Sequence, residues 1–213
     1  HLVAYTAVAT EELRAVLLQG QNDPDGALAA IRRALDTSLA EVGRARQAAG
    51  SARTDLEYDA AIRQRNNVMG TTAWIYFAQG RNEEAEGIAR LGLRLAAEER
   101  TGGGTVAFWH ERLAQALLGE RRFEEAAASA DEALAVLRAS GAGESSVRTV
   151  LTQTILLQAL FGRERWAEAD RLAGGMRAAT TGDRTARGMV DNPVLQAFLH
   201  LKNNRPGQAR ERI

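Results

Sequence analysis

Residues 114–134 read AQALLGERRFEEAAASADEAL, and residues 73–93 read AWIYFAQGRNEEAEGIARLGL. Each stretch has a glycine near its middle, Gly119 or Gly80, and a small residue in the matching place, Ala126 or Ala85. Self-similarity at a period of about 40 residues, as between these two stretches, is typical of arrays of helices. The pattern therefore predicts a helical repeat protein.

The same small residue recurs along the whole chain. Its positions are Ala27, Ala85, Ala126, Ala169 and Ala209, which are nearly evenly spaced except for a longer first interval. Short side chains also recur at a fixed distance before most of these alanines, as at Ala73 and Ala114. Two helices approach to about 8 Å only where their side chains are short. Each repeat is therefore predicted to be a hairpin of two closely packed helices.

The turns inside the hairpins are marked by residues that end or begin helices. They read QGQNDPDGA, QGRNEEA, GERRFEEA, GRERWAEA and NNRPGQA. Glycine and asparagine end helices, proline is tolerated in a first turn, and acidic residues are favoured there by the helix dipole. The predicted helices are 2–20 with 24–49, 54–79 with 82–100, 105–119 with 122–140, 144–162 with 165–180, and 188–203 with 206–213. The predicted fold is all-α: a right-handed superhelical array of about five hairpins in one domain, 1–213.

Composition excludes several classes of function. The 213 residues are 45% hydrophobic, and 27 basic residues balance 27 acidic ones, so neither nucleic acid nor a membrane is an expected partner. The chain has no cysteine, which removes disulfides and thiolate metal sites. It begins on His1 inside a predicted helix, and we expect it to be a fragment of a longer, cytoplasmic protein.

The sequence offers no catalytic or cofactor motif. HERLA at 110–114 begins like a zinc-peptidase helix, but Ala114 stands where the second histidine is needed. TGGGTV at 101–106 lacks the ending of a phosphate-binding loop. A lone histidine such as His200 is predicted to be structural. We therefore expect no enzyme, no metal and no cofactor.

The repeat pattern resembles the tetratricopeptide repeat family, in a longer form found in bacterial signalling proteins. The turn QGRNEEA matches, and so do small and aromatic positions in three repeats: Ala73, Ala85, Gly92, Ala114, Phe123, Ala126, Ala133, Trp166 and Ala169. The outer repeats depart from the family, because Pro24 and Pro206 replace the usual aromatic after the turn. Such repeat segments accompany caspase-like peptidase domains or transcription regulators.

The resemblance implies a binding groove lined by the first helix of each hairpin. The family's groove positions fall on Asn67, Trp74, Phe77, Glu111, Gln115, Thr154, Gln158, Phe161 and Phe198. Amides interleaved with aromatics suit a peptide with large apolar anchors. Packing against the next helix is the alternative role for each aromatic, and it is the one predicted for Trp109 and Trp166. Arg63 and Arg65 could hold a carboxylate, but as exposed arginines they are predicted to be solvated or paired with neighbouring acids.

The predicted function is a protein-interaction scaffold, the regulatory part of a larger bacterial signalling protein. Its partner would be a protein, a peptide or another domain of the same chain. Two alternatives remain open from the sequence. The inner wall could bind a small molecule, or the chain could self-associate through its ends as a structural module.

Overall fold

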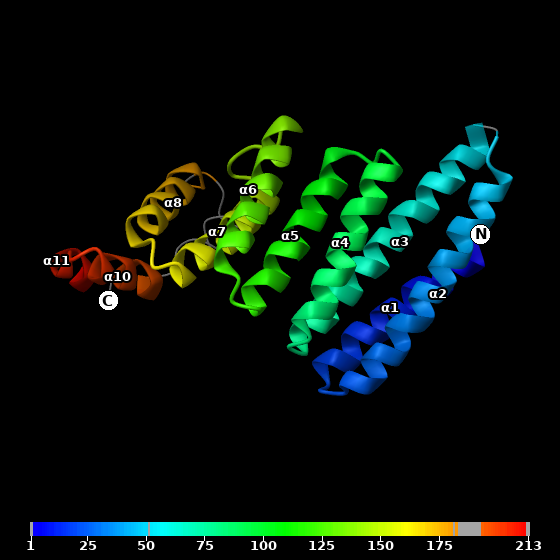
Figure 1. The fold of residues 1–213 in the computed structure, drawn as a ribbon, viewed down its shortest axis with the longest axis horizontal. Helices are drawn as coiled ribbons and strands as arrows, with labels where there is room; N and C mark the ends of the chain where they lie inside the picture. The colour runs from blue at the N-terminus through cyan, green and yellow to red at the C-terminus, as the bar shows by residue number, and fades with distance from the viewer. Residues whose placement is uncertain (1, 51, 181, 183–192, 212–213) are drawn as a thin grey trace. The chain divides into compact units, whose positions relative to one another are not determined.

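The computed structural model describes residues 2–50, 52–180, 182 and 193–211, and within this part the chain is all-helical with no strand (Figure 1). The helices follow one another in neighbouring pairs, so the predicted all-α helical-repeat array is confirmed. They are α1 (Leu2–Gly20), α2 (Pro24–Ala48), α3 (Ala52–Ala78), α4 (Asn82–Glu98), α5 (Gly103–Gly119), α6 (Phe123–Ala139), α7 (Val147–Gly162), α8 (Trp166–Ala179), α10 (Pro193–Lys202) and α11 (Pro206–Arg210).

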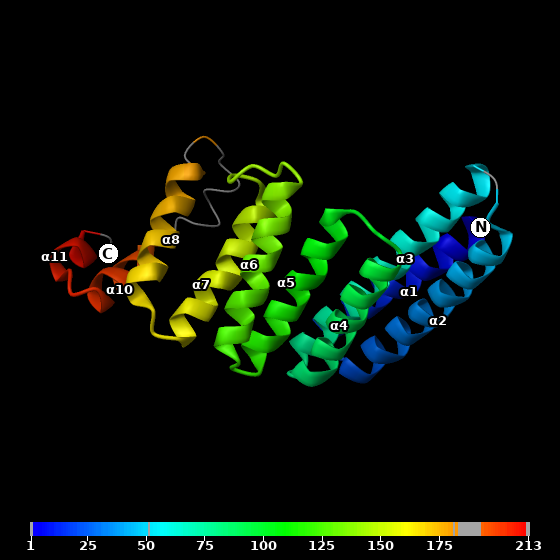
Figure 2. The same cartoon turned by 45° about the horizontal axis from the view of Figure 1, so that its top comes forward.

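The chain divides into two compact units, His1–Glu98 and Glu99–Ile213. In the first unit α1 packs on α2, α2 on α3 and α3 on α4, while α1 also contacts α3 (Figure 2). In the second unit the neighbouring helices from α5 to α8 pack in order, α8 contacts α10, and α5 also contacts α7. The predicted single domain over 1–213 stays a prediction.

Within the described residues, the predicted helix bounds are confirmed to within three residues, and the start of α7 is one place where the difference reaches three. Helix α7 begins at Val147, not at residue 144 as predicted, because Ser146 caps it: the Ser146 Oγ accepts a hydrogen bond from the Thr149 N–H at 3.2 Å. The long interval from Ala27 to Ala85 is explained by the lengths of α2 and α3, which have 25 and 27 residues. Residues 188–192 of the predicted ninth helix lie outside the described residues.

The five hairpin turns in the described part of the chain close with the same backbone motif. In the third hairpin the Arg122 N–H donates to the Leu117 carbonyl at 2.9 Å, and the Arg121 N–H donates to the Leu118 carbonyl at 3.0 Å. This pair of bonds is the Schellman motif, which requires a left-handed residue just after the helix. The left-handed residues are Asn22, Gly80, Arg121, Glu164 and Asn204, with φ between 55° and 73°. The repeat is therefore set by a backbone conformation that only Gly80 adopts without steric cost.

We predict that Gly80→Ala lowers the free energy of unfolding by about 1 kcal/mol, because alanine pays the left-handed penalty that glycine avoids. Gly87→Ala is the matched control in the adjoining helix α4. An added Cβ at Gly87 meets no atom within 4 Å, so the control is expected to stabilise by about 0.5–1 kcal/mol through helix propensity. Urea denaturation of both variants measures the difference; equal shifts would contradict the role of Gly80.

The second helices begin on a repeated ion pair. Arg81 and Arg122 each precede such a helix and contact a glutamate three residues later, at 2.6 Å from Glu84 and from Glu125. Arg165 makes the same contact with Glu168. These exposed pairs each contribute about 0–1 kcal/mol. The acidic residues in these first helical turns are therefore stabilised by an arginine as well as by the helix dipole.

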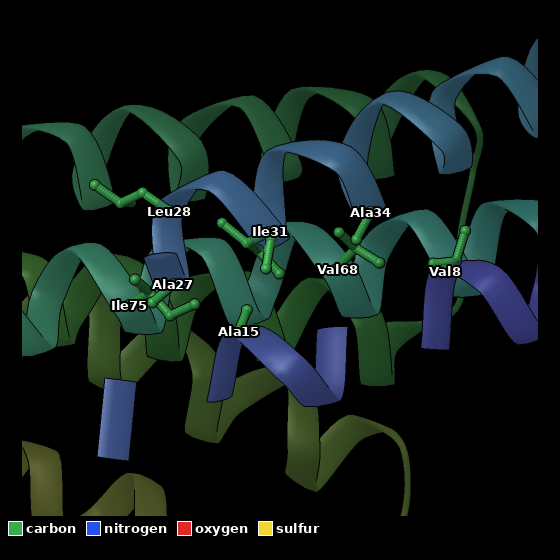
Figure 3. Packing of buried hydrophobic residues seen from close by; sticks show 9 residues of the cluster. Val8, Ala15, Ala27, Leu28, Ile31, Ala34, Val68 and Ile75 are labelled. Atoms are coloured by element: carbon green, nitrogen blue, oxygen red, sulfur yellow. The ribbon is translucent and has the colours of Figure 1, made fainter. Parts of the chain in front are cut away.

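The small residues that define the repeat lie in the core, as their spacing predicted. All five aligned alanines, from Ala27 to Ala209, are at most 2% exposed. In the first unit, Ala27 belongs to a cluster of buried side chains from α1, α2 and α3 (Figure 3). Its labelled members are Val8, Ala15, Ala27, Leu28, Ile31, Ala34, Val68 and Ile75. Among the residues described, no helix is long and apolar enough to cross a membrane.

Candidate binding face on the first helices

In the second unit, the first helices of the hairpins each carry a stripe of accessible side chains at alternating spacings of four and three. We call these residues the first-helix face. They are Gly104, Phe108, Glu111, Gln115 and Leu118 on α5, Val147, Leu151, Thr154, Gln158 and Phe161 on α7, and Phe198 and Leu201 on α10. Every one is exposed or partly exposed, and the spacing places each stripe along one side of its helix. Six of the nine predicted groove residues belong to this face.

Hydrogen bonds to the Glu111 carboxylate link α5 to α7. Its two carboxylate oxygens accept from Arg148, Oε1 from Nε at 3.0 Å and Oε2 from Nη2 at 3.1 Å. The Thr152 hydroxyl donates to Oε1 at 2.7 Å. The Glu111 side chain is 15% exposed. Its carboxylate is therefore engaged by α7, which makes Glu111 a positioning residue for the face.

Two guanidinium groups flank the Phe108 ring. The Arg112 and Arg148 guanidinium carbons lie 5.0 Å and 5.7 Å from the ring centroid. Arg112 also donates from Nη1 to the Gln115 Oε1 at 2.8 Å, which orients that amide. Burial lowers the pKa of Arg112, the Glu111 carboxylate opposes this shift and Arg148 adds to it. Arg112, Arg148 and Glu111 together leave one net positive charge on this part of the face.

Three aromatic rings meet where α7, α8 and α10 converge. The Phe161, Trp166 and Phe198 centroids lie 5.6–6.0 Å apart, and the Phe198 ring stands edge-on to the other two. We call these residues the aromatic cluster. The Lys202 ammonium lies 5.0 Å from the Trp166 centroid and 5.5 Å from that of Phe198. The predicted packing role of Trp166 between hairpins is confirmed, because its ring contacts both neighbouring first helices.

The remainder of the face combines apolar and polar side chains. Leu151 and Leu201 are 50% and 56% exposed, which is high for leucine. Gln158 is exposed, whereas the Thr154 hydroxyl donates to the Val150 carbonyl at 2.9 Å within its own helix. The face thus offers apolar side chains beside an amide.

The other three predicted groove residues lie on α3 in the first unit. Asn67 is exposed and Phe77 is 37% exposed, but Trp74 packs against the core cluster of its unit. Glu12 accepts a hydrogen bond from Thr71 at 2.5 Å and thereby joins α1 to α3. Arg65 was predicted to be exposed. This is wrong: Arg65 is 3% exposed and donates to Asn66, because its position in α3 faces the interior.

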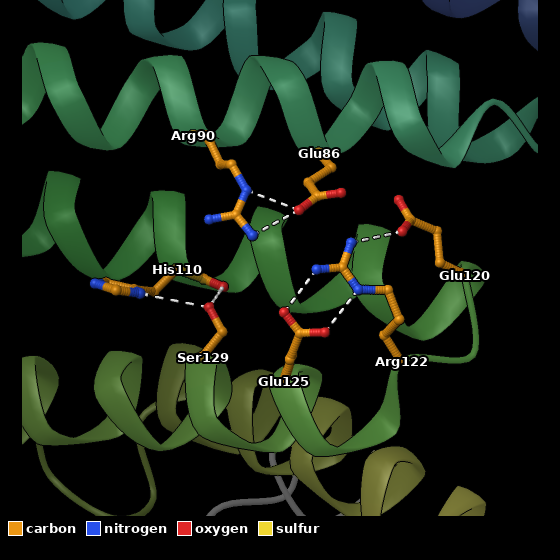
Figure 4. Close-up of polar contacts among 7 residues, drawn as sticks. All are labelled: Glu86, Arg90, His110, Glu120, Arg122, Glu125 and Ser129. Atoms are coloured by element: carbon orange, nitrogen blue, oxygen red, sulfur yellow. Dashed lines mark hydrogen bonds and ion pairs between the residues drawn. The ribbon is translucent and has the colours of Figure 1, made fainter.

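His110, His200 and Trp109 have structural surroundings, as predicted. Trp109 is fully buried, and His200 is 8% exposed. The Ser129 hydroxyl donates to the His110 carbonyl at 3.0 Å, and its oxygen lies 3.4 Å from the His110 Nδ1 (Figure 4). Burial lowers the pKa of His110, and Glu132 opposes the shift. Within the described part of the chain, no three acidic or histidine side chains are grouped to hold a metal.

Sequence reasoning missed three residues that shape the face: Arg112, Arg148 and Lys202. Arg148 lies 37 residues from the carboxylate that it contacts, so only the packing of α5 on α7 brings the two together. Lys202 is the one lysine in the sequence, which is the only feature that could have drawn attention to it.

Comparison with known proteins supports the fold. No protein-family model matches the chain, and no curated protein matches its sequence. Among solved structures the chain is similar to BtubC (BKLC) from P. vanneervenii, with a TM-score of 0.63 and 16% sequence identity. The likeness covers 99% of this chain and 88% of that one. At this level of identity, it establishes a shared helical fold.

Proposed function

We propose that this chain is a protein-interaction module of the tetratricopeptide repeat type, which binds a peptide along the first-helix face of its second unit. The observation that carries the proposal is the exposure of large apolar side chains on successive first helices, Leu151 on α7 and Phe198 with Leu201 on α10. Exposed apolar side chains gathered on one surface are typical of interaction sites. A bound peptide would cover them.

The polar members of the face support a peptide over a featureless apolar partner. Gln158 is exposed, and the Gln115 amide is oriented by Arg112, so both side chains can meet backbone amide groups of an extended chain. The Glu111 contacts hold α5 and α7 in fixed register. A preorganised surface loses less side-chain entropy when it binds.

The wider setting is part of the same proposal. We place the module in a larger bacterial signalling protein of the cytoplasm, where peptide binding would regulate an attached domain. Asn67, Trp74 and Phe77 are a second group of proposed contacts, on α3 of the first unit.

The experiment starts from peptides selected on the intact chain from a random display library. We expect Leu151→Ser with Leu201→Ser to weaken the selected peptides at least about tenfold, because both anchors lose apolar contact. Leu39→Ser is the control, since Leu39 on α2 is 48% exposed but belongs to a second helix. Its affinity should stay within about twofold. Failure to enrich any peptide, or equal binding by all variants, would rule out the face.

Exposed leucines are better probes here than the aromatics. Trp74 packs against the core of its unit and Phe161 packs against Trp166, so truncating either would also disturb packing. Leu151 and Leu201 are at least half exposed. Their replacement by serine leaves the core intact, and a circular-dichroism melt verifies this for each variant.

A further inference from the structure

We propose that the aromatic cluster recognises a lysine side chain of the bound peptide, and that Lys202 occupies this site when no peptide is present. The inference rests on the proposed function, since it names one side chain of the partner. It begins from the observed contact: the Lys202 ammonium lies over the faces of Trp166 and Phe198. Aromatic faces attract cations, and tryptophan does so most strongly.

The rings are held in place without the lysine. The Asn203 amide donates to the Trp166 carbonyl at 3.1 Å and to the Leu199 carbonyl at 2.9 Å, which fastens the end of α10 to the start of α8. Phe161 reaches the same point from α7, where its ring contacts both others. Moving the Lys202 side chain away therefore leaves a preformed corner of three rings.

Lys202 is held weakly enough to be displaced. Its side chain is exposed, and among the residues that the structure places it forms no ion pair. A cation over an aromatic ring at an exposed site gains only about 0.5–1 kcal/mol. The long flexible stem can rotate into solvent at little cost in packing. An incoming ammonium would then take the same contacts.

The site also lies where a bound peptide would pass. Phe161 and Phe198 belong both to the aromatic cluster and to the first-helix face, and Phe198 is 39% exposed. Leu201, one of the proposed anchors, directly precedes Lys202 in the chain. A peptide seated on Leu201 would therefore bring a neighbouring side chain to the rings.

A purely structural role for Lys202 makes a different prediction. One hairpin earlier, the repeat position that matches Lys202 is Gly162 at the end of α7. A Cβ added to Gly162 would meet the ring of Phe123, the aromatic residue that begins α6. Trp166 fills the same place as Phe123 in the next hairpin. If Lys202 only covers the Trp166 ring, removing its charge would open no site for another ammonium.

The test follows the three indole N–H resonances of the nitrogen-15 labelled chain, with Trp166 assigned through Trp166→Phe. Nα-acetyl-lysine methylamide is titrated into the wild type and into Lys202→Met, and Nα-acetyl-norleucine methylamide is the neutral control. We expect the lysine probe to shift the Trp166 resonance and to bind Lys202→Met about fivefold more tightly, because the competing ammonium is gone. The norleucine probe should have a much smaller effect.

Three results would overturn the proposal: equal shifts from both probes, no Trp166 shift in either protein, or equal affinity of wild type and Lys202→Met. Lys202→Gln repeats the test if the methionine variant melts at a lower temperature. The titration needs no partner, so it can fail while the selected peptides still bind the face. Conversely, if the lysine probe binds at Trp166 but no peptide can be selected, the ammonium site is supported and the peptide-binding face is ruled out.

Discussion

Replacing Gly162 with alanine is expected to destabilise the second unit by about 1–3 kcal/mol. A Cβ built at Gly162 would lie 2.3 Å from two atoms of the Phe123 ring, well inside van der Waals contact. The nearest atoms belong to the root of the ring, so a small rotation does not relieve the overlap. Either α7 must move away from α6 or Phe123 must leave its place. Urea denaturation followed by circular dichroism measures the loss.

Gly175→Ala is the matched control for this prediction. Gly175 lies inside α8, and an added Cβ there meets no atom within 4 Å. It should stabilise by about 0.5–1 kcal/mol, the usual gain for alanine in a helix. Phe123→Ala provides the second check: combined with Gly162→Ala it should cost less than the sum of the two single changes, since the ring that clashes is gone. Additive effects would contradict the contact.

Glu111→Gln is expected to destabilise the same unit by about 2 kcal/mol. The amide keeps the shape of the carboxylate but accepts at only one oxygen, so one of the Arg148 contacts is lost. Arg112 and Arg148 then lie near Phe108 without a compensating negative charge. The pair is partly accessible to water, which keeps the cost below that of a fully buried pair.

The exposed pair of Glu124 with Arg163 is the control for Glu111. The Glu124 side chain is 77% exposed, so Glu124→Gln should change the free energy of unfolding by less than about 0.5 kcal/mol. Added salt should also reduce the small effect at Glu124 more than the effect at Glu111, because dissolved ions screen an exposed pair more strongly than a partly buried one. Similar losses in the two variants would show that Glu111 has no special role.

The fold could be predicted because each repeat is marked by local features of the sequence. Short side chains mark where two helices touch, and glycine, asparagine and proline mark where they end. These features placed nearly every helix end within a few residues. The left-handed residues Arg121 and Glu164 could not be foreseen, since their type does not favour that conformation. Their positions follow from the turn that the preceding glycine and the hairpin packing impose.

The accessibility of the first-helix stripe could be predicted from the sequence, whereas the contacts of its side chains could not. The resemblance to tetratricopeptide repeats pointed to the accessible stripe, because that stripe follows directly from helix periodicity. It could not show that the Glu111 carboxylate is engaged by Arg148 or that Trp74 packs inward, since both depend on neighbouring helices. The prediction that Arg65 is exposed was wrong for the same reason. A charged side chain is usually solvated, but Arg65 is buried in the first unit.

The position of Lys202 has a practical consequence for anyone who immobilises this chain. Lys202 is the sole lysine of the 213 residues, so reagents that couple to side-chain amines react at one position. The Lys202 ammonium at this position lies over the rings of Trp166 and Phe198. A sensor surface made by amine chemistry would therefore orient many molecules with the aromatic cluster against the matrix and hide the end of the first-helix face. Attachment through a group other than Lys202 avoids modification of the aromatic cluster.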